Sequence, residues 1–507
     1  MELPIVRFSK LVGADAFPAI AMLFIFFCFV YTLRRLAPTR LPPGPFAWPI
    51  IGNLHQLGML PHHSLKDLAH KYGPIMYLRL GSFPTLVVSS SDMAKEVLTT
   101  HDLAFAGRPS LAAYFAYNQK PASLAPYGDH FRRVKKIWMT QLLSAKRLES
   151  FRVVREEAVC AAMRSVWEKS KEGTVSVNVS HVLLSLTKNL IWQILAGSIY
   201  SVGSSEQGFL YNKEIADMME QVIETVNAVN IGDSVPLLGW LDVQGLKKKM
   251  REANDSFDRL IQNVIDEHAS AKSSQKSTVE DVIDALLDMA ETDDSLDIKS
   301  IIFVLLFSAI ETTAASLEWA MVEMLRNTHV AKKLEQEIDS VVGKDRMVRE
   351  SDLPSMEYLH CVVKETLRLY PTGPLMLPHE STEACTVGPD RFIIPEKTRL
   401  IVNLWAIHTD PASWEDPLTF NPERFMGQDI DIKDRDFKML PFGTGRRGCP
   451  GILMALGTIE LVLSQLMHCF HWRLESDQSA LDMSEVLGVA LKRKKNLLSI
   501  PTLKLSL

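Results

Sequence analysis

A glycine-rich loop around one cysteine constrains the fold of this 507-residue chain more than any other feature. The loop spans Pro441–Gly451, and a largely apolar run, Ile452–Leu466, follows it. Its glycines let the backbone turn tightly and approach a flat ligand closely. Free amides facing the Cys449 thiol should lower its pKa and hold it as a thiolate. We expect the apolar run to form a buried helix with its amino end toward the sulfur, and Arg447 suits a carboxylate partner.

Composition excludes several classes of protein. The chain has 55 basic and 60 acidic residues, a net charge of −5, which argues against a dedicated nucleic-acid binder. The six cysteines form no CxxC pair, so neither a disulfide scaffold nor a zinc ribbon is expected. We therefore expect the protein to reside in a reducing compartment. No glycine-rich dinucleotide or nucleoside-triphosphate motif is present.

The amino terminus carries one uncharged stretch, Ala16–Leu33. As a helix its 18 residues would extend about 27 Å, enough to cross a hydrocarbon core. A cleaved signal peptide is the alternative, but no small-x-small cleavage site follows, and Arg34 and Arg35 end the stretch. We therefore expect an uncleaved signal anchor over residues 1–33, a stiff proline-rich hinge over 34–53, and a cytosolic domain over 54–507.

Helical periodicity dominates the rest of the chain, and there is no repeat. Helices are expected over Leu65–Lys71, Ser91–Thr100, Phe131–Leu143, Leu148–Lys169, Leu183–Leu195, Asn212–Val229, Leu246–Ser270, Val279–Glu291, Ile298–Arg326, Val330–Val342 and Tyr358–Leu369. Strand-like runs are few: Ile75–Leu80, Thr85–Ser89, Ile393–Pro395 and Arg399–Leu404. The fold class is therefore mainly α, one large helical domain with small β-sheets.

Two further patterns carry candidate chemistry. Glu311 and Thr312 stand in the middle of the long apolar helix, where an acid followed by a hydroxyl is locally unfavourable. In the simpler interpretation Thr312 bonds back to a preceding carbonyl and Glu311 reaches a surface. Glu365 and Arg368 are three residues apart on one helical face, which taken alone is usually a weak surface ion pair.

The cysteine loop matches FxxGxRxCxG, and the chain is identified as resembling the cytochromes P450. Further stretches are similar to plant microsomal members of the seventy-one clan: Phe105–Pro109, Pro126–Asp129, Trp405–His408 and Glu485–Gly488. The resemblance implies the cytochrome P450 fold and a haem b cofactor. It makes Cys449 the axial thiolate ligand of the iron, and it places Phe442, Gly443, Arg447 and Gly451 in the cofactor-binding loop. A thiolate ligand favours cleavage of the O–O bond.

The same resemblance assigns roles to the other motifs. Ser308–Thr313 resembles the oxygen-activation motif, in which Thr312 hydrogen-bonds dioxygen and water at the iron and Glu311 feeds a proton relay. The sequence departs from that motif at Ser308 and at Ala309, where glycine is usual. Glu365, Arg368 and Arg424 resemble a structural triad that holds the haem-side core.

Propionate and substrate contacts are also implied. Lys135 takes the place of the arginine in a WxxxR motif whose tryptophan is Phe131 here, and it could pair with a propionate as a point charge. His379 matches a further propionate position. Segments similar to the family's substrate contacts are largely apolar, and they indicate the residues Phe303, Ala309, Leu375, Met376 and Leu487.

The implied reaction is monooxygenation, with electrons from NADPH delivered by a separate membrane-bound NADPH–cytochrome P450 reductase. The apolar contacts favour a small lipophilic substrate, a terpenoid such as a diterpenoid over a phenolic. The implied location is the endoplasmic reticulum membrane, with a single pass. One alternative is a P450 that rearranges hydroperoxides without O2 or a reductase; another is a non-catalytic membrane haem protein.

Overall fold

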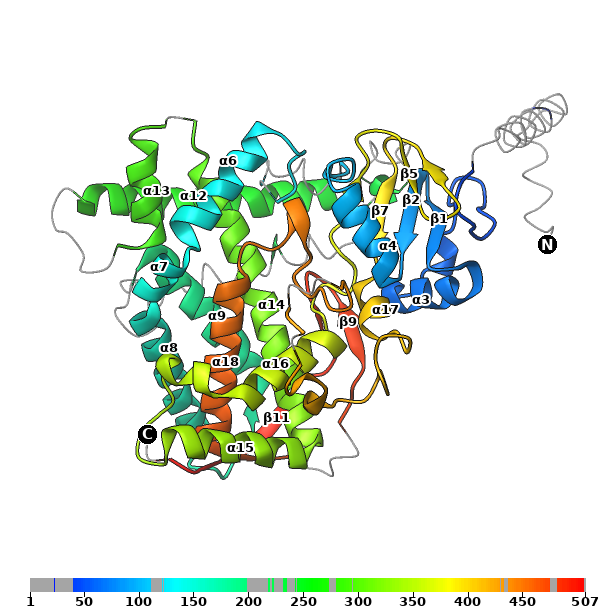
Figure 1. The fold of residues 1–507 in the computed structure, drawn as a ribbon. Coiled ribbons are helices and arrows are strands. Elements are labelled where there is room, and N and C mark those ends of the chain that lie inside the picture. The colour runs from blue at the N-terminus through cyan, green and yellow to red at the C-terminus, as the bar shows by residue number, and fades with distance from the viewer. Residues whose placement is uncertain are drawn as a thin grey trace, which may run out of the picture.

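The computed structural model describes residues 22, 40–110, 121, 123–197, 218, 221–222, 231–234, 242, 244–272, 280–293, 295–428, 430–432, 436–474 and 481–505. Helices form one side of the molecule, and a small sheet with short helices forms the other (Figure 1). All of the expected signal anchor except residue 22 and most of the helix expected over 212–229 lie outside the described residues.

The helical side is built from helices that pack on one another. They are α6 (Asp129–Ile137), α7 (Ala145–Ser150), α8 (Arg152–Lys169), α9 (Val179–Ala196), α12 (Leu246–Lys272), α13 (Val282–Ala290), α14 (Ile298–Arg326), α15 (Thr328–Val342), α16 (Glu357–Leu369) and α18 (Ile452–Cys469). Three further α-helices, α3 (Pro61–Tyr72), α4 (Ser91–Lys95) and α17 (Leu404–His408), lie beside the sheet (Figure 1).

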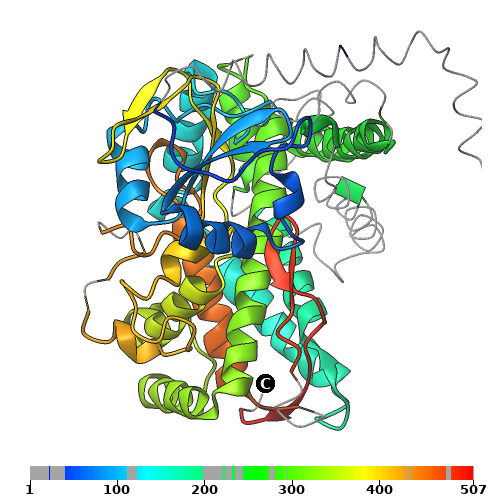
Figure 2. The same cartoon turned by 90° about the vertical axis from the view of Figure 1, so that its right-hand side faces the viewer.

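Helix α14 is the axis of the helical side. Its bounds are those expected from the sequence, because the Asp297 side chain caps the first turn by accepting from Ser300 N–H and an almost unbroken apolar run follows. It packs on α9, α16 and α18, and the carboxy-terminal strands run beside it (Figure 2). Both α14 and α18 are long and apolar enough to cross a membrane, but most of each helix is buried in the core.

The strands form four small sheets. The largest has the order β1 (Ile75–Leu80), β2 (Phe83–Val88), β7 (Arg399–Val402) and β4 (His379–Glu380). A three-stranded sheet joins β3 (Val177–Asn178), β11 (Leu498–Leu503) and β8 (Phe470–Arg473). Two hairpins pair β5 (Cys385–Val387) with β6 (Phe392–Ile394), and β9 (Glu485–Leu487) with β10 (Leu491–Arg493).

Most expected elements are present, with local differences. The helix expected over Ser91–Thr100 is α4 followed by a π-helical turn, Glu96–Thr100, and α6 likewise continues into a π-helical turn, Trp138–Leu142. The helix expected from Leu148 is divided, because Phe151 ends α7 and α8 starts after it. The strands after residue 469 were not predicted, since β8 and β11 pair with segments distant in sequence and β9 and β10 are only three residues long.

A buried ion network joins α16 to the segment before the cysteine loop. Glu365 and Arg368 are both fully buried, and Arg368 Nε and Nη2 donate to the two carboxylate oxygens at 2.7 and 2.8 Å. Arg424 Nε donates to Glu365 Oε1 at 3.0 Å. Arg368 Nη1 also donates to the carbonyls of His408 and Pro417, each at 2.8 Å. The structure therefore brings the three expected residues together: Arg368 forms a bidentate pair with Glu365, and Arg424 binds the same carboxylate.

We expect Arg368→Leu to lower the free energy of unfolding by about 3–5 kcal/mol, because it leaves the buried Glu365 carboxylate with one cationic partner. Arg152→Leu is the matched control. Its partner Glu149 has the same three-residue spacing, but that pair is largely exposed, so a loss under about 1 kcal/mol is expected. Urea unfolding of both variants measures the difference, and equal losses would contradict a special role for the buried network.

Candidate functional site

The loop before α18 is shaped by two glycines in left-handed backbone conformations. Gly443 has φ 62° and Gly445 has φ 68°. A Cβ at Gly445 would lie 2.8 Å from Asp102 Oδ1, so a side chain there would clash with the neighbouring segment. Cys449 N–H donates to the Phe442 carbonyl at 2.9 Å and closes the turn. These conformations hold the loop against the protein body with the cysteine near its end.

The Cys449 sulfur lies deep in the protein and yet is accessible. Burial raises the pKa of the thiol, while the Gly451 amide and the charge of Lys135 lower it. The expected depression of this pKa is therefore wrong as a net effect, because removal from water outweighs the amide that faces the sulfur. Coordination to a metal ion deprotonates a thiol outright, so a thiolate at this position depends on the iron and less on the loop.

Arg447 presents a half-buried cation beside the loop. Its Nε and Nη2 donate to the carbonyls of Ala106 and Ala125 at 2.9 and 2.7 Å, whereas its Nη1 is buried and has no partner. Burial, and after it the charge of Arg108, lowers the pKa of Arg447 to about 10. No carboxylate pairs with Arg447 among the residues that the structure describes. Such a group is suited to an anionic ligand.

His379 lies in the same electrostatic neighbourhood. Its Nδ1 is 2.7 Å from the Phe105 carbonyl and its Nε2 is buried without a partner. Burial and the charge of Arg108 lower the pKa of His379 to about 3, and Arg447 adds to this effect. A carbonyl can only accept, so Nδ1 carries the proton and Nε2 is protonated only in the imidazolium form. An anion would favour that charged form, which the two arginines oppose.

Sequence reasoning missed Arg108, which lies at the centre of this group. Its Nη1 donates to the carbonyls of Leu377 and Pro378 at 2.7 and 2.9 Å, directly before His379. Arg108 belongs to the stretch Phe105–Pro109, which resembles the family. Nothing in the sequence, however, indicates that Arg108 is buried near Arg447.

Lys135 lies under the cysteine loop. Its Nζ donates to the carbonyls of Arg446 and Gly445, and burial lowers its pKa. The neighbouring Phe131 is buried, and its ring lies 3.9 Å from the Arg447 guanidinium. Phe131 therefore fixes the arginine through a cation–π contact.

The acid and the hydroxyl of α14 differ in their contacts. Thr312 Oγ1 donates to the Ser308 carbonyl at 2.7 Å, the back-bonding that the simpler interpretation predicts. Glu311 does not reach a surface: it is buried, its Oε1 lies 3.5 Å from Lys492 Nζ of β10, and its Oε2 is without a partner. The simpler interpretation is thus wrong for the acid, which is held inside the protein with one free oxygen.

The expected substrate contacts come from separate elements. Phe303 packs in α14 against Phe257 and Phe307, with ring centroids 5.2 and 4.5 Å away. Met376 is buried beside the cysteine loop, 3.2 Å from where a Cβ of Gly443 would stand. Ala309 lines a small apolar pocket with Leu305 and Met454 among other residues. Leu375 packs at the sheet and Leu487 pairs with Leu491 in the β9–β10 hairpin.

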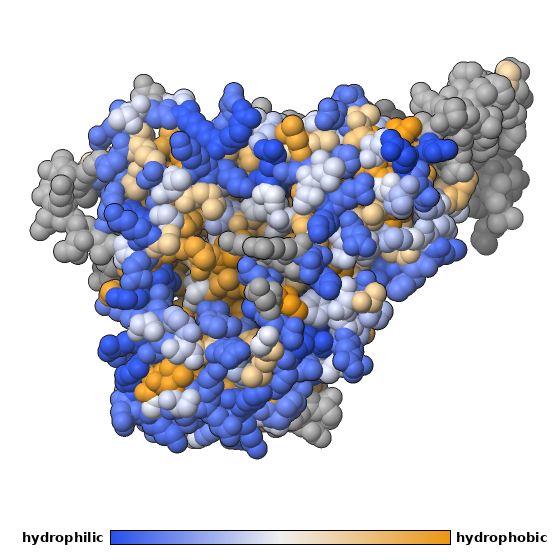
Figure 3. Space-filling view, in the orientation of Figure 1, coloured by the Kyte–Doolittle hydropathy of each residue, from blue (hydrophilic) through white to orange (hydrophobic). Residues whose placement is uncertain are grey.

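These side chains match the chemistry of a haem. An accessible thiol is suited to ligating iron, and an arginine and a histidine with unpartnered buried nitrogens suit the anionic propionates. Hydrophobic residues gather in a hollow of the face seen in Figure 3, which suits an apolar macrocycle.

Comparisons with known proteins identify the family of the chain. Residues 42–500 match the family model described as Cytochrome P450. Cytochrome P450 750A1 of Pinus taeda is 48% identical over 95% of each chain. Strychnine-11-hydroxylase of Strychnos nux-vomica is 41% identical over 94% of this chain and 95% of the other, and salviol synthase of Salvia pomifera is 38% identical over 96% and 97%. A zebra fish cytochrome P450 structure with progesterone has a TM-score of 0.73 at 25% identity, covering 87% of this chain and 99% of the other.

The fold, the cysteine loop and the extent of these matches lead to one conclusion. The chain belongs to the plant cytochromes P450, haem-thiolate monooxygenases, and is close to members of the seventy-one clan.

Proposed function

We propose that this cytochrome P450 inserts one oxygen atom from O2 into a small lipophilic terpenoid, such as a diterpenoid, with electrons from NADPH through a separate reductase. The observation that carries the proposal is that the chain holds both an accessible Cys449 and a buried acid, Glu311, in α14, and a non-catalytic haem protein does not need that acid. The same acid argues against a hydroperoxide-rearranging P450, which does not need protons delivered to O2. Bound through a thiolate, haem supplies the iron that activates O2.

The protein side chains divide into three tasks in this proposal. Cys449 ligates the iron, and the loop residues Phe442, Gly443 and Gly451 shape its approach to the ring. Arg447 and His379 receive the propionates through nitrogens that have no protein partner. Lys135 contributes positive charge from beneath the loop.

Thr312 and Glu311 hold and move protons. With its hydrogen donated to the Ser308 carbonyl, the Thr312 hydroxyl oxygen keeps lone pairs that accept from a water molecule. The free Oε2 of Glu311 is a second acceptor on the adjacent residue, and Lys492 holds the other carboxylate oxygen. Together they supply a short path for protons along α14.

The expected substrate contacts are apolar, and this character supports the proposed substrate class. Phe303, Ala309, Leu375, Met376 and Leu487 offer no side-chain donor or acceptor apart from the weakly accepting Met376 sulfur. Such contacts favour a hydrocarbon skeleton over a phenolic ring with several hydroxyl groups. The relatives named salviol synthase and strychnine-11-hydroxylase support specialised metabolism as the setting.

We further propose that residues 1–33 anchor the enzyme in the endoplasmic reticulum membrane by a single pass, and that residues 34–53 form the hinge to a cytosolic catalytic domain. The uncharged stretch ended by Arg34 and Arg35 supports this arrangement.

The thiolate ligand is tested by the carbon-monoxide difference spectrum of the reduced protein. We expect the far-red-shifted band of a thiolate-ligated haem in the wild type and its loss in Cys449→Ser, because a hydroxyl does not replace the thiolate. Cys385→Ser is the matched control, a half-buried cysteine on β5 that should leave the band unchanged. A band that survives in Cys449→Ser would contradict the assignment.

The proton path is tested by Thr312→Ala. We expect NADPH consumption to continue while the ratio of product to NADPH falls by about 10-fold or more, since the hydroxyl that orders water is removed. Thr312→Ser should restore most of the coupling. Thr313→Ala, a change at the next threonine, which is the more deeply buried of the two, should leave the ratio unchanged, whereas a similar loss there would indicate a general packing effect.

Substrate class and electron source are tested with microsomes that contain the enzyme and a plant reductase. A panel of diterpenoids, phenolics and strychnine is assayed with NADPH under O2. Oxygenated product from a terpenoid, dependent on NADPH and on the reductase, is the expected result. Turnover of a hydroperoxide without NADPH would favour the rearranging alternative, and preference for phenolics would contradict the proposed substrate class.

A further inference from the structure

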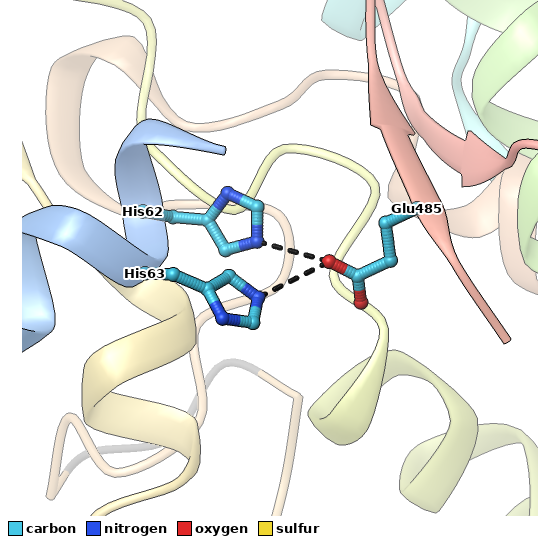
Figure 4. Close-up of side chains that lie close together, drawn as sticks. All are labelled: His62, His63 and Glu485. Carbon is cyan, nitrogen blue, oxygen red and sulfur yellow. Dashed lines mark hydrogen bonds and ion pairs between the residues drawn. The ribbon is translucent and has the colours of Figure 1, made fainter. Parts of the chain in front are cut away.

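Two adjacent histidines of α3 converge on one glutamate of β9 (Figure 4). The Nε2 atoms of His62 and His63 each lie 3.2 Å from Glu485 Oε2. The three potential ligand atoms all lie within 4.8 Å of one another. In a tetrahedral zinc site with bonds of about 2.0–2.1 Å, neighbouring ligand atoms are about 3.3–3.4 Å apart. The observed spacing to the carboxylate therefore needs little adjustment to accept an ion.

We propose that His62, His63 and Glu485 form a binding site for Zn²⁺ that is separate from the haem site. Two imidazole nitrogens and one carboxylate oxygen are a donor set typical of zinc, and they leave a fourth position for water. The His63 side chain is 43% exposed while His62 is fully buried, so the site is open to solvent on one side.

The charge balance of this cluster favours a cation. The Glu485 side chain is only 12% exposed, and no lysine or arginine in the described part of the chain forms an ion pair with it. A largely buried carboxylate without such a partner is stabilised by a divalent ion bound between it and the two imidazole nitrogens.

The rings are held in place before any ion binds. Trp405 of α17 stacks on the His63 ring at 4.1 Å and meets the His62 ring edge-on at 5.4 Å. Lys66 lies on the Trp405 ring and donates to Thr409, so its charge is engaged away from the ligand atoms. Ligands with fixed orientations lose less freedom on binding an ion.

A second cluster, His268 with Asp281 and Asp284, lacks these properties. Asp281 caps α13 by accepting from Asp284 N–H at 2.9 Å, so one of its oxygens is already used. Although burial opposes it, the hydrogen bond and charge of Asp281 raise the pKa of His268, and a protonated imidazole does not bind metal. This cluster therefore serves as an internal comparison.

The test uses the full-length holoenzyme without a polyhistidine tag. Equilibrium dialysis against Zn²⁺, with the bound metal counted by atomic emission, should give one tightly bound ion per chain. His63→Ala and Glu485→Gln should each weaken binding by about tenfold or more, since each removes a ligand. His70→Ala, an exposed histidine of the same helix, and His268→Ala are the controls and should bind as the wild type does.

Folding and ligand identity are checked separately. Both site variants change few buried contacts, and the carbon-monoxide spectrum confirms that they retain haem. Zinc should raise the thermal midpoint of the wild type and leave that of His63→Ala unchanged. X-ray absorption at the zinc edge should show a nitrogen and oxygen shell at about 2.0–2.1 Å and no sulfur at about 2.3 Å. The absence of binding, a sulfur shell, or loss of zinc in His268→Ala alone would overturn the proposal.

Discussion

The arrangement around Cys449 depends on the burial of positive charge beside it. Arg447 and Arg108 lie close enough for the second to lower the pKa of the first, and both act on His379. Each arginine is held by backbone carbonyls, which cannot be titrated away. Cations crowded in this manner are stabilised by an anionic partner, and the two propionates of the proposed haem site would supply that charge. In the proposal the electrostatics of this group therefore specify the haem site together with the cysteine.

The same principle explains why sequence reasoning identified some of the site and not all of it. The cysteine loop and α14 were predictable, because short-range chemistry determines them: glycines where φ is positive, and an apolar run between Asp297 and Arg326. The burial of Arg108 and the choice of Lys492 as partner for Glu311 depend on chain segments far apart in sequence. Periodicity carries no information about such contacts.

The Cys449 thiol illustrates the limit in another way. The sequence correctly indicates amides near the sulfur, and the Gly451 amide does lower the pKa. It does not indicate how much protein surrounds the accessible sulfur, and that larger effect raises the pKa. The separate helices α7 and α8 are a similar case, since the apolar pattern is continuous through Phe151 although the helix is interrupted there. The hydrophobic pattern of a sequence predicts the type of secondary structure better than it predicts the net result of opposing effects on a pKa or on a helix end.

The β9–β10 hairpin connects these features. Lys492 and Arg493 are adjacent in β10, and they pair with Glu311 and Glu318, which lie seven residues, or about two turns, apart on α14. Trp319 Nε1 also donates to the Leu491 carbonyl at 3.2 Å, so the strand is attached to the helix at successive residues.

A slip of one residue in this hairpin would exchange the two faces of its strands. It would remove Lys492 from Glu311 and, on the paired strand, turn Glu485 away from His62 and His63. The register of the β9–β10 hairpin therefore sets both the contact of Lys492 with Glu311 and the contact of Glu485 with the histidine pair of α3. An ion at the histidine pair would stabilise that register through Glu485, on the strand paired with the one that contacts α14.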